Sequence, residues 1–166
     1  MNKNKEDRIT VDLGNVEIKA KSPLWYNPDS DDPNGYPVLN NVFEFKMGIY
    51  PRALWIAVGA SPDDLNKLFP DGDSNGDPFM EMDPSDDGIV DDVERLIPSP
   101  YGGVLIRFNS VNDINFDSAA HECCHTAFSF FRYINSVVSS DTEETFCYLL
   151  GYLAKCCEFV KNKLSK

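Results

Sequence analysis

The spacing of the hydrophobic residues changes near residue 117, and this change constrains the fold more than any other feature of the sequence. Before it, apolar residues alternate with polar ones at 9–19 and 42–49, or form short runs at 53–58 and 104–108. Both patterns are typical of strands. After residue 117 the apolar residues recur with helical spacing. Strands first and helices last predict an α+β fold, with a small, twisted, mainly antiparallel sheet packed on a C-terminal pair of helices.

Capping residues predict where the helices begin. Asp117 or Ser118 is expected to cap the first of the two C-terminal helices. The second is expected to begin near Asp141 and to run towards Lys163. A short helix is also expected after Ser61, because a Ser cap is followed there by a Pro-Asp-Asp first turn.

The 166 residues are expected to form a single domain, 1–166, with three recognisable parts. Residues 1–40 are predicted to be an N-terminal arm, formed by a β-hairpin around Gly14-Asn15 and a proline-rich loop. Residues 71–92 are predicted to be an acidic loop insertion, with a turn or two of helix at 90–97. The functional core is expected within 104–164.

Charge and cysteine content narrow the classes of partner and compartment. A net charge of −12 argues against nucleic acid and against docking on anionic membranes. The N-terminus is polar, and no apolar run is long enough to span a bilayer. Five cysteines lie in the C-terminal third without any CxxC pair, which favours reduced thiols in a cytoplasmic protein. They are Cys123, Cys124, Cys147, Cys156 and Cys157.

The only two histidines of the chain stand in one motif, His121-Glu122-Cys123-Cys124-His125. A spacing of four places both imidazoles on one face of a helix, so that both can reach one zinc ion. Glu122 is rotated by about 100° from His121, which suits a base acting on a metal-bound water rather than a ligand. The alternative interpretation is a helix that carries two ordinary histidines.

A hydrolytic zinc site needs a third protein ligand, and Glu144 is the first candidate. If Ser140 caps the second helix, Glu143 closes a capping box and Glu144 is free to face inward. If Asp141 is the cap instead, Glu144 closes its box; Glu143 is the fallback ligand. The first helix must then end at about residues 133–135, with Asn135 in a left-handed conformation. Cys124 or Cys147 as a thiolate ligand would instead give a closed, structural site.

The order of a strand, an HExxH helix and a Glu at the start of a second helix resembles the glutamate zincins, which include thermolysin-like and ImmA/IrrE-type peptidases. The stretch 143–153, EETFCYLLGYL, is similar to the second helix of small HExxH proteins carried by phages and prophages of gut bacteria. The resemblance covers about 104–157. It implies a zinc metallopeptidase in which His121, His125 and Glu144 bind the metal and Glu122 is the general base.

The resemblance also implies further roles. The strand before the active-site helix would bind an extended peptide by β-augmentation; its residues are Val104, Leu105, Ile106, Arg107 and Phe108. Thermolysin-like enzymes have an Asp four residues after the ligand Glu, where this chain has Tyr148, and a later histidine that it lacks. A tyrosine hydroxyl could stabilise the oxyanion instead, from Tyr148 first, or from Tyr152 or Tyr101.

The leading expectation is a cytoplasmic zinc peptidase of a bacterium or a phage-infected cell, acting on a peptide or protein substrate. A non-catalytic, zinc-stabilised interaction protein, possible for a phage product, is the alternative. A third hypothesis is calcium binding at 71–82, where Asp71, Asp73 and Asn75 with Gly76 match half of an EF-hand loop. Met82 stands where that loop requires Glu.

Overall fold

The structure is a computed structural model that describes residues 8–12, 17–21, 41–48, 50–69, 79–83, 85–95 and 101–165. Its centre is a six-stranded sheet with the strand order β1-β2-β3-β4-β6-β5. The strands are β1 (Arg8–Asp12), β2 (Glu17–Lys21), β3 (Val42–Lys46), β4 (Ala53–Val58), β5 (Gly88–Arg95) and β6 (Tyr101–Phe108). The helices are α1 (Pro62–Leu68), α2 (Phe116–Tyr133) and α3 (Glu143–Leu164), and a 3₁₀ turn, η2, spans Val111–Asp113.

The strand pairing confirms the predicted α+β class and the mainly antiparallel sheet. Strands β1 to β4 follow one another as antiparallel neighbours, and β5 pairs antiparallel with β6. Only β4 and β6 are parallel. The predicted N-terminal hairpin is present as β1 and β2, whereas its Gly14-Asn15 turn lies outside the described residues.

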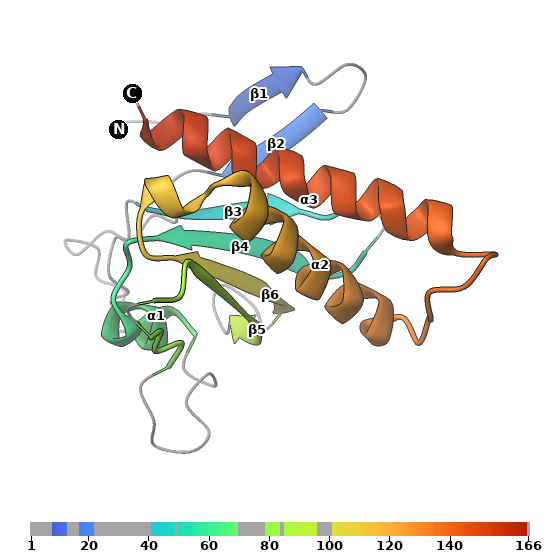
Figure 1. The fold of residues 1–166 in the computed structure, drawn as a ribbon, viewed down its shortest axis with the longest axis horizontal. Coiled ribbons are helices and arrows are strands. Elements are labelled where there is room, and N and C mark those ends of the chain that lie inside the picture. Colours follow the sequence, from blue (N-terminus) through green and yellow to red (C-terminus); the bar gives the residue numbers. More distant parts are fainter. Residues whose placement is uncertain are drawn as a thin grey trace, which may run out of the picture.

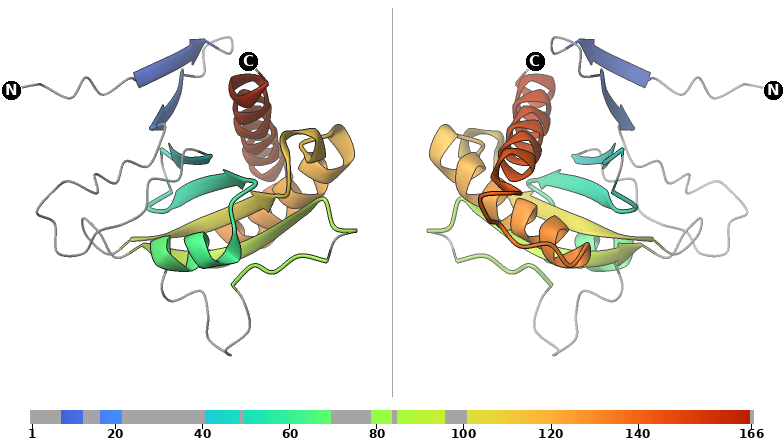
Figure 2. Two further views of the ribbon diagram at one scale, coloured as in Figure 1. Left: turned by 90° about the vertical axis from the view of Figure 1, so that its left-hand side faces the viewer. Right: turned by 90° about the vertical axis from the view of Figure 1, so that its right-hand side faces the viewer.

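Helices cover both faces of the sheet (Figures 1 and 2). On one face, Val104, Ile106 and Phe108 join a core that includes residues of α2 and α3. On the other face, Trp55 and Leu105 join residues of α1 and Phe79 in a second core. The alternation along β6 therefore divides its side chains between two cores, which is why the strand reads as a continuous apolar run.

Helix α1 begins as predicted, but the caps of the two long helices differ from the prediction. The Ser61 side chain accepts a hydrogen bond from the backbone N–H of Asp64, at 3.2 Å. Helix α2 is capped by Asn115, two residues before the predicted Asp117. Helix α3 begins at Glu143 after Thr142, which makes no side-chain cap hydrogen bond. The predicted capping box of the second helix is therefore absent.

The end of α2 is where the sequence predicted it. The helix stops at Tyr133, and Asn135 has a φ of 54°, in the left-handed region that Asn tolerates. The chain then returns as α3, antiparallel to α2. Cys123 Sγ lies 3.6 Å from Cys157 Sγ, and the Phe128 ring centroid lies 4.9 Å from that of Phe146. These two contacts fix the register of the helix pair.

Two predictions for the segment before β6 are wrong. Residues 88–92 belong to strand β5 rather than to the acidic loop, and 90–95 form no helical turn. The calcium-binding hypothesis depends on residues 71–78, which lie outside the described residues. No helix in the described part of the chain is both long and apolar enough to cross a membrane.

Candidate active site

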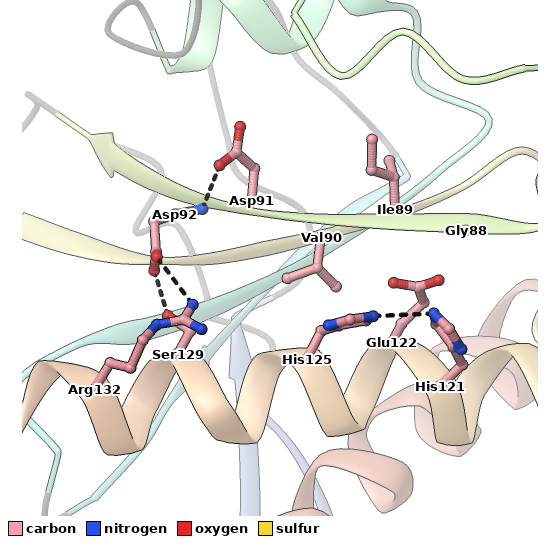
Figure 3. Close-up of a pocket in the computed structure, with 10 residues that line it drawn as sticks. All are labelled: Gly88, Ile89, Val90, Asp91, Asp92, His121, Glu122, His125, Ser129 and Arg132. Carbon is pink, nitrogen blue, oxygen red and sulfur yellow. Dashed lines mark hydrogen bonds and ion pairs between the residues drawn. The ribbon is translucent and has the colours of Figure 1, made fainter. Parts of the chain in front are cut away.

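A groove of about 310 Å³ lies between strand β5 and helix α2 (Figure 3). Five of its lining residues come from consecutive positions of the strand, and five come from one face of the helix. They are Gly88, Ile89, Val90, Asp91, Asp92, His121, Glu122, His125, Ser129 and Arg132. The HExxH motif thus faces a strand that the sequence did not predict.

The two imidazoles of the motif converge. His121 Nε2 lies 3.0 Å from His125 Nε2, and both side chains are exposed to the groove. Two bonds of about 2.0–2.1 Å from a single ion to nitrogens at this separation subtend roughly 95°, not far from the tetrahedral angle that zinc prefers. The pair therefore fits two positions of a zinc coordination sphere.

Glu122 is buried beneath the histidines, with 6% of its surface exposed. Burial raises the pKa of its carboxyl group, while the positive charges of protonated His121 and His125 act in the opposite direction. Asp86 adds a negative charge that raises this pKa further. The carboxyl group of Glu122 therefore lies beside the two imidazoles, where a proton acceptor for a metal-bound water would be needed.

Gly88 of β5 makes room for this carboxylate. A Cβ atom at position 88 would lie 2.8 Å from Glu122 Cγ and 3.2 Å from Glu122 Oε1. Separations below 3.0 Å require one of the two groups to move. The absence of a side chain at position 88 therefore sets how close Glu122 can lie to the strand.

Strand β5 is an edge strand of the sheet. Within the described ranges it pairs on one side only, with β6. Val90 and Asp92 point towards α2, whereas Ile89 and Asp91 point away from it (Figure 3). The groove therefore has a strand edge whose backbone groups can hydrogen-bond with an added chain.

The structure contradicts the assignment of 104–108 as the peptide-binding strand. Residues Val104, Leu105, Ile106, Arg107 and Phe108 pair with β4 on one side and with β5 on the other. Their backbone groups are therefore used within the sheet, and all five residues are buried. The guanidinium of Arg107 donates hydrogen bonds to the carbonyls of Ala60 and Met80, which is a structural role.

At one end of the groove, hydrogen bonds join the residue just before β5 to the start of α2. Asp87 Oδ2 accepts hydrogen bonds from Ser118 Oγ at 2.6 Å and from Asn115 Nδ2 at 3.2 Å. These bonds hold the pKa of Asp87 below its usual value. Asn115 is also the cap of α2. The beginning of the strand and the beginning of the helix are therefore held together at this end.

A polar cluster around Asp92 lies at the other end of the groove. Arg52 donates a hydrogen bond to Asp92 Oδ1 at 2.7 Å and another to the carbonyl of Gly103, also at 2.7 Å. Ser129 of α2 donates to the same oxygen of Asp92, and Arg52 donates to Ser129 Oγ at 3.2 Å. The Arg52 side chain is 9% exposed. This cluster ties α2 to strands β5 and β6.

The structure does not bring Glu144 to the histidines. Phe146 packs against Phe128 and Phe131, so Glu144 lies level with the end of α2. Eight residues, about 12 Å of helix, separate His125 from that end.

The direction of the side chains differs as well. Cys123 contacts α3 and lies two residues, or about 200° around the helix, from each histidine. The histidines therefore face away from the helix that carries Glu144 and the fallback ligand Glu143. Both glutamates are exposed. Among the described residues no group of three or more His, Cys, Asp or Glu side chains is placed to hold a metal ion.

The other predicted residues whose side chains the structure describes do not line the groove. Tyr148 is 76% exposed on α3 and does not line the groove. Cys147 is exposed on the same helix, and Cys124 is half-buried against the core of the sheet. Tyr152 is half-buried, and its side chain hydrogen-bonds with Cys156. The side chain of Tyr101 lies outside the described residues.

No protein-family profile, no curated protein and no solved structure matches this chain.

Replacing Gly88 with Ala is expected to destabilise the fold by about 1 kcal/mol, because the new methyl group overlaps the Glu122 side chain. Urea unfolding of the variant beside wild type measures this cost. The same substitution in a Glu122→Ala background is the control, since the overlapping Cγ and carboxylate are then gone. An equal cost in both backgrounds would show that Glu122 is not the group displaced.

Proposed function

We propose that the groove binds one zinc ion through His121 and His125 and hydrolyses peptide bonds of an extended chain that pairs with the edge of β5. The observation that carries the proposal is the convergence of three features in one groove. They are two Nε2 atoms 3.0 Å apart, a buried carboxylate beside them, and an edge strand that lines the same groove. The HExxH motif was predicted from the sequence, whereas the edge strand β5 was found only in the structure. The two observations therefore support the proposal independently.

Strand β5 and Glu122 would have separate roles in the reaction. Backbone groups of β5 would bind and orient the peptide by strand addition, which fixes the scissile bond beside the histidines. Zinc, when bound, supplies a Lewis acid and a water of lowered pKa. Glu122 would accept the proton of the attacking water and deliver it to the leaving amine.

We also propose a cytoplasmic location. The sequence supports it, because five cysteines without a CxxC pair are typical of reduced thiols in a cytoplasmic protein.

Zinc binding is the first test. We expect one zinc per chain, lost or weakened by at least about 100-fold on His121→Ala or His125→Ala, since even residues behind a metal ligand commonly contribute 10–100-fold. Glu144→Gln should leave the affinity unchanged, because Glu144 lies at the far end of α2 and faces away. Isothermal titration calorimetry with ZnCl₂ measures the zinc affinity of the wild type and of the three variants, each in the apo form. Unaltered binding in the histidine variants would remove the site, and weakened binding in Glu144→Gln would reinstate it as a ligand.

One observation favours a second candidate function. The described residues offer two protein ligands, whereas catalytic zinc sites have three. A groove with this donor set is also consistent with a zinc-dependent peptide-binding protein without turnover, such as a phage-encoded interaction protein. The two functions differ in one result: peptide capture without cleavage supports the second.

A further inference from the structure

Arg132 is an exposed cation at the Asp92 end of the groove. Its side chain is 70% exposed, and it lies on the same helical stripe as His121 and His125, three turns beyond His121. Its Nη2 atom forms an ion pair with Asp92 Oδ2 at 3.9 Å, which is too long for a hydrogen bond. Arg52 and Ser129 donate to the other oxygen of Asp92, Oδ1, so Arg132 shares this carboxylate with Arg52.

The charges along the groove are therefore separated. At the Asp92 end, Arg52 and Arg132 carry two positive charges against one carboxylate, and Asp91 points away from the helix (Figure 3). At the other end lie Glu122, Asp86 and Asp87. Among the described side chains of the groove, guanidinium charge is therefore in excess of carboxylate charge at the Asp92 end.

The strand geometry places this guanidinium relative to a bound peptide. Neighbouring residues on paired strands point to the same face of the sheet, and side chains alternate between faces. A peptide residue paired with Asp92 would therefore point towards α2, beside Arg132. The residue paired with Val90 would point towards the histidines, two positions away in the peptide.

We infer that Arg132 is a specificity residue that binds a carboxylate of the peptide, two positions from the residue that faces the histidines. This inference rests on the proposed binding of a peptide to β5. Arg offers carboxylates a planar, bidentate set of donors, which Lys and Gln cannot reproduce. The carboxylate can belong to an Asp or Glu side chain or to the C-terminus of the peptide, and both use the same chemistry.

The test uses a mixed library of unstructured synthetic octapeptides, one half with free and one half with amidated C-termini, and zinc-loaded protein. Capture is measured on Glu122→Gln and cleavage on protein with Glu122 intact, each with Arg132 unchanged or replaced by Gln, Lys or Glu. Sequencing by mass spectrometry gives the residue preference. Lys163→Gln, an exposed cation of α3 outside the groove, is the control for lost charge.

We expect Asp and Glu to be enriched about tenfold at one fixed position, or free C-termini over amidated ones. Arg132→Gln should abolish the preference, Arg132→Glu should replace it by one for Lys and Arg, and Lys163→Gln should keep it. Cleavage or capture without an acidic preference, or a preference that survives in Arg132→Gln, would overturn the inference and leave the proposed function standing. Capture with the preference but without cleavage would support the inference and overturn the proposed hydrolysis. If no peptide is captured or cleaved, both fail.

Discussion

Glu122→Gln is expected to lower kcat for peptide hydrolysis by at least about 100-fold while zinc remains bound. A positioned general base contributes roughly 10²–10⁴ in rate, and an amide of the same shape cannot accept the proton of the attacking water. Glu122 is buried beside Gly88, so the isosteric amide fits the same space. Steady-state rates on a peptide cleaved by the wild type, with elemental zinc analysis of each variant, measure the effect.

Glu144→Gln is the matched control for this experiment. It makes the same chemical change in a glutamate of α3 that is exposed and lies level with the end of α2. Its rate and zinc content should equal those of the wild type. Hydrolysis that survives Glu122→Gln would exclude this residue as the base, and an equal loss in both variants would show that α3 supplies part of the site.

The sequence located the metal-type pair but not the strand it faces. The spacing of His121 and His125 requires only one helix, and local periodicity determines that helix. Strand β5 is the opposite case, because Gly88–Arg95 carries three acidic residues in its eight, which lower its apparent strand propensity. The sequence features that favour a strand here are the β-branched residues Ile89, Val90 and Val93. Their pairing with β6 is tertiary, and no local pattern reports it.

The misplaced third ligand has a similar cause. The end of α2 at Tyr133 and the left-handed Asn135 follow from local preferences, and both predictions were confirmed. Whether Glu144 reaches the histidines depends instead on which side of α2 the second helix covers. The contact between Cys123 and Cys157 decides this, and it joins residues 34 positions apart. The capping residues at the start of α3 do not determine which side of α2 this helix covers.

The cluster around Asp92 could not be predicted for the same reason. Arg52 directly precedes β4, Asp92 lies on β5 and Ser129 lies on α2. Asp92 and Ser129 are 40 and 77 residues from Arg52 in the chain. Arg52 also lies 4.7 Å from the Tyr133 ring centroid, so the cluster supports the end of α2 as well. From the sequence alone, each of the three would be predicted to be an ordinary surface polar residue.

Gly103→Ala is expected to destabilise the protein by about 3 kcal/mol or more, the largest effect predicted for a single methyl group in this chain. A Cβ at position 103 would lie 2.3 Å from the Ala53 carbonyl oxygen and 2.3 Å from Trp55 Cζ3. The carbonyl belongs to the backbone of the adjacent strand, and Trp55 is fully buried. Neither group can withdraw without moving β4.

Gly102→Ala provides the matched control, because a Cβ there would meet Val93 O at 3.7 Å and Arg52 Nε at 3.9 Å, which are ordinary contacts. Urea unfolding of both variants should show a large loss for Gly103→Ala and a small one for Gly102→Ala. Similar losses would mean that backbone freedom, rather than space, is what position 103 requires. Gly103 pairs with Ala53 and Val93, and its carbonyl accepts from Arg52. The substitution should therefore also disturb the Arg52–Asp92 contact and weaken the acidic preference ascribed to Arg132.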